Sequence, residues 1–365
     1  MTTSPSDATT PDGSPGSTGS TGTTTATRPA PAPSDPAFDD AVIRYRRELL
    51  AHCYRMTGSP TEAEDLVQEV YLRAWRAYGS FEGRSSLRTW LHRIATNVCL
   101  SALEGKERRT LPTGLGAPSS SGADPLDERV EVPWLGPMPD AALTGTADPA
   151  DIVAERDTLR IAFVAALQHL PPRQRAVLVL REVLRWSAAE VAEATGSSVA
   201  SVNSALQRAR ATLAAVAPSP DAPSRPDLSD EQRALLDRYV DAFWRKDVDA
   251  IAALFTDDAV WEMPPFAGWY RGPRTIAELV DTQCPGGRYD MPLVPTDCNG
   301  QPSFGLYMRE DGPDGDRYLP FQLHVLDLEG SAVRHATVFF DETYFALAGL
   351  PAELGPQDVP ARPGS

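Results

Sequence analysis

The sequence has few of the residues and patterns that mark a metal centre or a membrane segment. Its 365 residues include four cysteines and five histidines, and no two cysteines have the spacing of a zinc-binding pair. We therefore expect no metal site and no cofactor, and we interpret the cysteines as reduced thiols of a cytoplasmic protein. No apolar run approaches the roughly 18 residues of a membrane helix, and the N-terminus lacks the apolar core of a signal peptide. We expect no contact with a membrane.

Positive charge is also scarce, but the deficit is uneven along the chain. The formal net charge is -16, yet residues 38–109 carry 12 basic and 10 acidic side chains, and residues 155–216 carry 8 and 5. Residues 225–365 carry 12 and 24. An evenly spread negative charge would argue against nucleic acid, whereas two mildly basic segments do not. The acidic C-terminal part either repels DNA or covers the basic segments within the same chain.

Composition divides the chain into modules and connections. Residues 1–37 are mostly Ser, Thr, Gly, Pro and Ala, which predicts a disordered tail. Residues 110–153 form a linker in which Arg129 stands against seven acids. Residues 218–227 are a proline-rich linker, and 351–365 a tail. Apolar residues interrupt the longer linker, and they either insert into a partner or pack on a neighbouring domain: Leu126, Val130, Val132, Trp134, Leu135 and Met138.

A helical hairpin follows Ser59. Ser59, Pro60 and Glu62 have the spacing of a capping box with proline in the first turn. A polar break over 79–86 separates the two helices, and a further helix over 38–53 joins the same bundle. Apolar residues recur at helical spacing on the first helix: Leu66, Val67, Val70, Tyr71, Ala74, Trp75 and Tyr78. The pattern predicts a helical bundle over 38–109.

Residues 154–217 have the pattern of a helix-turn-helix. Ser187 and Glu190 form a second capping box, a short helix ends before Gly196, and a longer helix begins at Val199. Five residues of that helix are expected to face inward: Val199, Val202, Leu206, Ala209 and Leu213. Seven are expected to face outward, where they suit either a DNA major groove or plain solvent: Ala200, Ser201, Asn203, Ser204, Gln207, Arg208 and Arg210.

The residues themselves point to a family. EDLVQEVYLRAWR followed by FEGRSSLRTWLHRIATN resembles region two of the extracytoplasmic-function (ECF) group of sigma-70 factors. LPPRQRAVLVLREV with WSAAEVAEATGSSVASVNSALQRARATL is similar to sigma region four. The resemblance implies partners, namely core RNA polymerase, through its clamp helices and flap, and promoter DNA. In region four, the outward residues of the last helix would read the -35 element.

In region two, the resemblance implies two sets of site residues. Four residues of the first helix would contact core polymerase: Asp65, Gln68, Glu69 and Arg73. Seven residues of the loop and second helix would engage the opened -10 strand: Phe81, Arg84, Ser85, Ser86, Arg88, Trp90 and Asn97. Trp90 is as well explained by core packing as by base stacking.

The C-terminal part predicts a different architecture. Two amphipathic helices over 228–255 precede four strand candidates, and an antiparallel sheet behind helices predicts an α+β cone over 228–350. The strand candidates are AVWEMPPF and residues 304–309, 318–327 and 332–340. YVDAFWRKDVDAIAALFTDDAVWEMPP with GWYRGPRTIAEL resembles the SnoaL-like branch of the nuclear-transport-factor-two superfamily. Members of that branch are either enzymes or ligand-binding modules.

Catalysis by the C-terminal domain would require a residue pair such as His324 and Asp341, as general base and orienting group. The alternative, which we favour, is a strand histidine with satisfied partners and an aspartate in solvent, so we expect no catalytic residue. A pocket or an ordinary core is predicted from six residues: Trp261, Met263, Phe266, Trp269, Tyr307 and His324.

The sequence therefore predicts all-α sigma domains followed by a SnoaL-like cone. We expect an ECF sigma factor that directs transcription initiation, is regulated in cis by its C-terminal domain, and has a small-molecule ligand as a further candidate partner. Two alternatives stay open. One is a helix-turn-helix repressor that acts without polymerase, and the other is a regulator fused to an active SnoaL-like enzyme.

Overall fold

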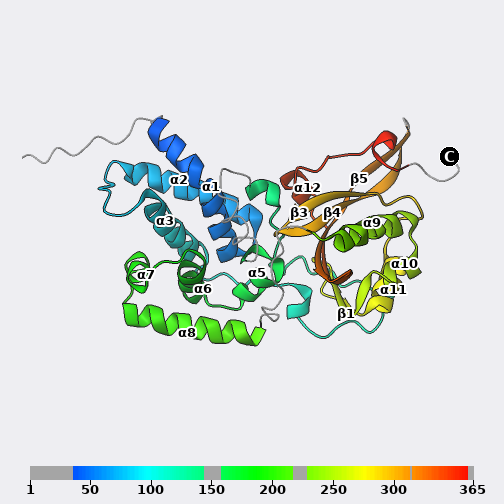
Figure 1. Cartoon of the computed structure of the whole chain (residues 1–365), viewed down its shortest axis with the longest axis horizontal. Helices are drawn as coiled ribbons and strands as arrows, with labels where there is room; N and C mark the ends of the chain where they lie inside the picture. Colours follow the sequence, from blue (N-terminus) through cyan, green and yellow to red (C-terminus); the bar gives the residue numbers. More distant parts are fainter. Residues whose placement is uncertain (1–35, 144–157, 217–227, 313–314, 361–365) are drawn as a thin grey trace, which may run out of the picture.

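The computed structural model describes residues 36–143, 158–216, 228–312 and 315–360. Most of the predicted N-terminal tail and the predicted linker over 218–227 lie outside the described residues. Figure 1 shows a helical part and a sheet-containing part side by side, with α5 between them. Within the described ranges, no helix combines the length and apolar character needed to cross a bilayer.

The N-terminal bundle has the three predicted helices: α1 (Pro36–Thr57), α2 (Pro60–Tyr78) and α3 (Leu87–Ala102). Ser59 caps α2, because its side-chain oxygen accepts a hydrogen bond from the Glu62 backbone N–H at 3.3 Å. The second half of the predicted capping box is absent, since the Glu62 carboxylate binds Lys106 and Arg109 instead. The core of the bundle is apolar and buried: Leu49, Leu50, Val67, Val70, Leu91, Ala95 and Val98.

The second helical unit contains α5 (Ile161–Gln168), α6 (Pro172–Leu178), the π-helical turn η3 (Val179–Val183), α7 (Ala188–Thr195) and α8 (Val199–Val216). The capping box of Ser187 and Glu190 is complete, and Gly196 ends α7 with a φ of 62°. Gly196 suits this position because left-handed backbone costs glycine little. The helix-turn-helix is confirmed. Val199 was expected inside but is exposed, because burial along α8 begins only at Val202.

The C-terminal domain is built on one six-stranded sheet of order β2-β1-β6-β5-β4-β3. The strands are β1 (Phe255–Glu262), β2 (Trp269–Arg271), β3 (Leu293–Cys298), β4 (Gln301–Gly312), β5 (Gly315–Glu329) and β6 (Ala332–Phe339). Neighbouring strands are antiparallel except β1 and β6, which pair in parallel. The sheet was expected to be antiparallel, and this parallel pair corrects that expectation, so the sheet is mixed.

Helices complete this domain: α9 (Asp230–Arg245), α10 (Val248–Ala252), α11 (Pro273–Gln283), α12 (Thr343–Leu347) and the 3-10 turn η4 (Pro356–Asp358). α9 packs on the sheet, where the ring of Tyr239 lies 5.7 Å from that of Phe304. The predicted helices and the strand candidates over 304–309, 318–327 and 332–340 are confirmed, whereas AVWEMPPF is a strand only over its first four residues, because β1 ends at Glu262. β2 and β3 were missed because β2 has three residues and β3 contains Pro295, a residue that weakens a strand pattern.

The segment over 110–143, here called the connector, lies on the C-terminal domain and includes the 3-10 turns η1 (Pro112–Gly114) and η2 (Asp140–Leu143). The Ser119 N–H donates to the Trp269 carbonyl at 2.8 Å, and the Arg129 N–H donates to the Pro265 carbonyl at 2.9 Å. Leu135 is fully buried, whereas Val130 is 78% exposed. Of the two interpretations of its apolar residues, packing on a neighbouring domain is the arrangement observed.

Candidate functional site

The face of α2 that was predicted to contact polymerase is open to solvent. Asp65, Gln68 and Arg73 are exposed, and Glu69 is half-buried. Glu69 binds Arg73 one turn later, with 2.6 Å between Oε1 and Nε. An exposed pair of this kind contributes little stability and can exchange for a partner's charge. The face is therefore accessible and carries both signs of charge.

The loop after α2 and the start of α3 form a partly exposed aromatic cluster. The Phe81 ring lies 5.0 Å from Trp90 and 6.5 Å from Tyr78. Arg84 and Ser85 beside it are exposed, while Ser86 caps α3 through the Thr89 N–H at 3.1 Å. Trp90 is half-buried, so it packs in the bundle while part of its ring stays accessible next to Phe81. Partly exposed aromatic rings beside an arginine suit stacking on an unpaired base.

Arg88 is already paired with an acidic residue of another helix. Its Nε lies 2.5 Å from a carboxylate oxygen of Glu48 on α1. DNA contact by Arg88 would require exchange of this partner.

All seven residues of α8 that were predicted to face outward are exposed: Ala200, Ser201, Asn203, Ser204, Gln207, Arg208 and Arg210. Arg210 also binds Glu182, with 2.5 Å between Nη2 and Oε1. The other side of the helix is buried through Val202, Leu206 and Ala209.

Region two and region four pack directly against each other. Asn97 on α3 and Ser201 on α8 line the same cavity, of about 690 Å³, between the two units. Next to it, Arg93 of α3 binds Glu193 of α7 at 2.9 Å. One residue predicted for the -10 element and one predicted for the -35 element thus lie across a single groove.

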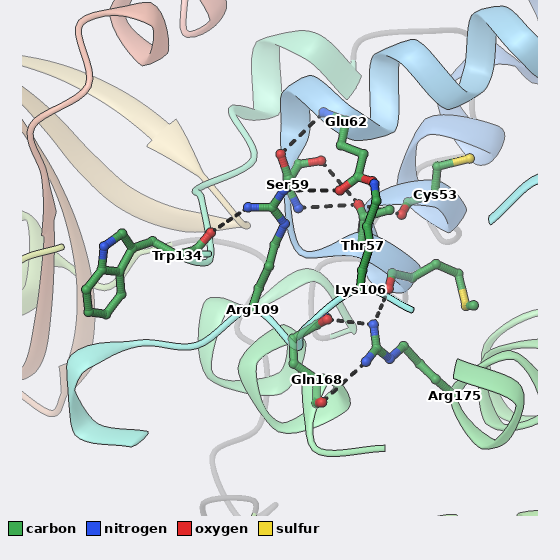
Figure 2. A network of polar contacts seen from close by, with 10 residues as sticks. Cys53, Thr57, Ser59, Glu62, Lys106, Arg109, Trp134, Gln168 and Arg175 are labelled. Atoms are coloured by element: carbon green, nitrogen blue, oxygen red, sulfur yellow. Dashed lines mark hydrogen bonds and ion pairs between the residues drawn. The ribbon is translucent and has the colours of Figure 1, made fainter. Parts of the chain in front are cut away.

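A buried arginine joins the two regions (Figure 2). Arg175 of α6 donates to the Met56 carbonyl at the end of α1, to Gln168 Oε1 at 2.5 Å and to the Leu170 carbonyl at 3.1 Å. No carboxylate of the described residues pairs with it. Because the charge is buried, the pKa of Arg175 is lowered to about 10.

A second part of the same network attaches the connector to the start of α2 (Figure 2). Arg109 donates to the Trp134 carbonyl at 2.9 Å and to the Glu62 carboxylate at 3.1 Å, and Lys106 binds the other oxygen of Glu62. Burial raises the pKa of Glu62, but the hydrogen bonds and charges of Lys106 and Arg109 outweigh it and leave a lowered pKa. Glu62 therefore stays ionised and holds the connector.

The turn between β3 and β4 meets three segments at one residue, Asn299. Its Nδ2 donates to Tyr54 Oη at 2.8 Å and to the Leu159 carbonyl at 2.6 Å, and its Oδ1 accepts from the Met138 N–H at 2.9 Å. The Asn299 N–H donates to the Met138 carbonyl at 2.8 Å. Burial raises the pKa of Tyr54, so its hydroxyl stays neutral and donates to the Gly136 carbonyl at 2.9 Å.

The start of α5 is attached to the same domain. Arg160 forms an ion pair with Asp327 of β5, and Asp327 also binds Arg334 of β6. The Ile161 N–H donates to Gln301 Oε1 at 3.0 Å. The C-terminal domain therefore contacts α1, the connector and the first helix of region four.

The C-terminal domain contains a cavity of about 320 Å³. Of the six predicted pocket residues, Trp261, Met263 and Phe266 line it. His324 lies behind Trp261, with 5.4 Å between the ring centroids. Trp269 and Tyr307 lie elsewhere, because the Trp269 indole donates to the Gly116 carbonyl at 2.8 Å and the Tyr307 hydroxyl to the Pro351 carbonyl at 2.7 Å.

His324 and Asp341 do not form a catalytic pair. His324 Nδ1 lies 2.8 Å from Tyr239 Oη, and Nε2 lies 3.0 Å from Gln322 Oε1. Burial lowers the pKa of His324 to about 3. Asp341 is exposed and accepts from Thr343 instead. A neutral histidine with both nitrogens engaged has no free nitrogen to take a proton from a substrate.

Comparisons with known proteins identify the family. Family models match residues 41–109 (Sigma-70 region 2), 160–213 (Sigma-70, region 4) and 236–301 (SnoaL-like domain). The ECF RNA polymerase sigma factor SigG of Mycobacterium tuberculosis is 57% identical over 312 residues, which cover 85% of this chain and 83% of SigG. The chain belongs to the ECF RNA polymerase sigma factors. This sigma factor is a transcription initiation factor rather than an enzyme, and it carries a fused SnoaL-like domain.

Other relatives agree with this assignment. The RNA polymerase sigma-H factor of Pseudomonas aeruginosa is 31% identical over 177 residues, which are 48% of this chain and 84% of that factor. The crystal structure of the M. tuberculosis ECF sigma factor SigJ has the same fold, with a TM-score of 0.56 at 22% identity. The match covers 87% of this chain and all of that one.

The residues that join the modules had little signal in the sequence. Tyr54 and Asn299, which share a hydrogen bond, are 245 positions apart. The pair Asn299-Gly300 is a turn signal, but a turn signal does not indicate which surface the turn contacts. In the sequence, Arg160 and Arg175 look like ordinary charged residues near helix ends, and only the structure shows their partners.

Proposed function

We propose that this sigma factor binds core RNA polymerase through the exposed face of α2 and engages the -10 and -35 elements through α3 and α8. We further propose that the SnoaL-like domain regulates it in cis by holding region two against region four. Partnership with core polymerase places the protein in the cytoplasm.

The observation that carries this proposal is the shared groove between α3 and α8. The names of the two promoter elements place them about 25 base pairs apart, which is roughly 85 Å of B-DNA at 3.4 Å per base pair. Asn97 and Ser201, one from each predicted DNA surface, line a single cavity. Both surfaces cannot engage a promoter in this arrangement, so regions two and four must separate first.

After separation, each surface has its own task. Phe81 and Trp90 offer partly exposed aromatic rings to bases of the opened -10 strand, where stacking offsets the few kcal/mol that unstacking costs. The exposed polar residues of α8 suit base edges in the major groove. Each contact alone is weak, and joining both to one polymerase raises the effective concentration of the second.

The contacts of Asn299 support regulation in cis. One turn of the SnoaL-like domain binds region two through Tyr54, the connector through Met138 and the start of region four through Leu159. Separation of regions two and four must break some of these contacts. The domain therefore sets the free energy of opening.

Polymerase binding is tested by charge reversal on α2. Asp65→Lys with Glu69→Lys should abolish co-purification with core polymerase and promoter-directed run-off transcription. The matched control, Asp281→Lys with Glu231→Lys, reverses two exposed acids of the SnoaL-like domain and should leave co-purification unchanged. Equal co-purification of the two double variants would refute the proposed interface.

The need for separation is tested by a reversible crosslink across the groove. Asn97→Cys with Ser201→Cys, joined by a reducible bismaleimide, should give no run-off transcript until the linker is reduced. Asn97→Cys with Gln207→Cys is the control, because Gln207 does not line the cavity. A crosslinked protein that initiates normally would contradict the proposal. Tight binding to promoter duplex without polymerase would instead favour the repressor alternative.

A further inference from the structure

We infer that the cavity of the SnoaL-like domain binds a small, uncharged, mostly apolar molecule that offers a hydrogen-bond acceptor to Gln322 and packs against Leu126 of the connector. The regulatory consequence drawn below rests on the proposed function, whereas the binding site does not.

The walls of the cavity determine the class of ligand. At about 320 Å³ it is large enough for a small organic molecule. Most of its lining is apolar, including Phe243, Met263, Phe266, Leu279, Phe321 and Phe340. None of the described residues that line it carries a charge. A charged ligand would lose its hydration without gaining a counter-ion, so the occupant is uncharged.

A buried chain of hydrogen bonds, here called the relay, runs from Tyr239 through His324 to Gln322 and orients the Gln322 amide in the cavity wall. Gln322 and His324 are two residues apart on β5 and therefore share a face of the sheet. Tyr239 Oη lies 2.8 Å from His324 Nδ1, and His324 Nε2 lies 3.0 Å from Gln322 Oε1. Because an amide oxygen only accepts, Nε2 carries the proton and Nδ1 accepts from Tyr239.

This relay leaves one group of Gln322 for a ligand. Its amide oxygen is taken by His324, and no residue in the described part of the chain accepts from its amide nitrogen. Gln322 itself lines the cavity. An amide N–H in an apolar wall favours a ligand with an acceptor such as a ketone oxygen. Tyr239 and His324 are then positioning residues for that donor.

The connector closes one side of the cavity. Leu126 lines it, and α11 holds the residues just before Leu126. Glu278 accepts from the Gly122 N–H at 2.9 Å, and the Thr282 hydroxyl donates to the Gly122 carbonyl at 3.1 Å. A Cβ at Gly122 would lie 2.3 Å from the backbone nitrogen of Leu279, so the close approach requires glycine. Leu126 forms part of the wall only while the connector is docked.

Ligand binding and connector docking are therefore coupled. A molecule that touches Leu126 binds the docked state more tightly than the undocked one and shifts the population toward it. The connector leads from region two to region four, so a bound ligand favours the packed arrangement. The ligand should accordingly lower promoter-directed transcription.

The binding site is tested on the full chain with a naphthyl methyl ketone as the probe and calorimetry as the measurement. The comparison compound has a methylene group in place of the carbonyl oxygen. Gln322→Leu should weaken ketone binding about three- to ten-fold, the range expected for one neutral hydrogen bond, and should not weaken binding of the hydrocarbon. In the unmodified protein, the infrared carbonyl stretch of the bound ketone should lie at lower frequency than in an alkane solvent.

Leu126 is tested against a matched leucine of the connector. Leu126→Ala should weaken binding of both compounds, whereas Leu115→Ala should not, since Leu115 is 47% exposed and does not line the cavity. Absence of ketone binding to the full chain overturns the site, as does an unshifted carbonyl stretch. Equal affinity of the two leucine variants overturns the role of the connector.

The regulatory consequence is tested separately by run-off transcription. The ketone should reduce the transcript made with the unmodified protein and should have a smaller effect with Leu126→Ala. It should also slow hydrogen exchange at the Ser119 and Arg129 amides, which donate to the C-terminal domain. Slower exchange without an effect on transcription leaves the ligand site standing and refutes cis regulation. Ketone binding with unchanged exchange refutes the coupling itself.

Discussion

Two sets of contacts between the modules of this sigma factor differ in chemistry. The inner joint, between region two and region four, depends on Arg175 and the surface pair of Arg93 and Glu193. The outer joint, between the SnoaL-like domain and both regions, depends on Asn299 with the ion pair of Arg160 and Asp327. Arg175 buries a charge against neutral oxygens, whereas Asn299 buries a neutral amide whose donors and acceptor are satisfied.

The difference shows which joint is the more stable. Burial of a guanidinium without a carboxylate partner loses hydration that neutral carbonyls only partly replace, and the lowered pKa of Arg175 reports that cost. Neutral hydrogen bonds in a buried site carry no such penalty. By this argument the inner joint is the weaker one, and we propose that the SnoaL-like domain keeps it closed.

The largest effect is expected from Asn299→Ala. The Met138 N–H, the Tyr54 hydroxyl and the Leu159 carbonyl would each lose a buried partner, at about 1–3 kcal/mol each, so the free energy of unfolding should fall by about 4 kcal/mol. Asn299→Gly also removes the side chain, but glycine tolerates the backbone φ of 58°, so this variant distinguishes lost hydrogen bonds from backbone strain.

Urea unfolding measures the stability of both variants, and both should give more run-off transcript. The exposed amide of Gln207 provides the control, because Gln207→Ala should shift stability by less than about 0.5 kcal/mol.

A smaller effect on stability is expected when the pH is lowered, through a histidine at the inner joint. His92 of α3 lies beside Trp186 of region four, with 6.5 Å between the rings. Burial lowers the pKa of His92 to about 4, below the 6.5 of an unfolded chain. The unfolded state therefore binds more protons between these values, and stability is lost as the pH falls from 6.5 toward 4, by at most about 3 kcal/mol. His92→Gln should flatten this dependence in urea unfolding at pH 7, 6 and 5, and an unchanged slope would contradict the assignment.

Arg175→Met should cost less than Asn299→Ala. The substitution removes hydrogen bonds but also relieves the buried charge, so the free energy of unfolding should fall by about 1 kcal/mol. A loss as large as that of Asn299→Ala would refute the ranking of the two joints. The measurement is urea unfolding, with the midpoint compared between the two variants.

The smallest effect is expected from Arg93→Ala. The side chains of Arg93 and Glu193 are 47% and 75% exposed, and pairs of this kind contribute about 0.5 kcal/mol or less. The change in urea midpoint should be near the limit of detection and should disappear in high salt. A loss above about 1 kcal/mol would mean that the surface pair, rather than Arg175, holds the inner joint.

Local patterns predicted most of the elements. The capping box at Ser187, the helical spacing along α2 and the strand-forming runs of β4 to β6 each depend on neighbours within a few residues. Such signals are complete in the sequence because they arise from helix and strand geometry. The outward face of α8 followed from the same periodicity. Only Val199, in the first turn, departed from it.

Contacts between modules could not be predicted in this way. The parallel pairing of β1 with β6, the docking of the connector on Trp269 and the convergence on Asn299 join residues far apart in the chain. Two of the predicted pocket residues, Trp269 and Tyr307, found partners elsewhere for the same reason. Aromatic spacing indicates burial but not the neighbours that a buried ring will meet.

By itself, the amino-acid sequence determined most of the helices, the helix-turn-helix, four of the six strands of the C-terminal sheet and the family, because these depend on side-chain periodicity and on residue identity. Only the tertiary structure decided that α3 and α8 share a groove, that Arg175 and Asn299 join the modules, and that Leu126 closes the C-terminal cavity. The physical reason is that burial and hydrogen-bond partners are properties of surfaces brought together by folding, which no local pattern records.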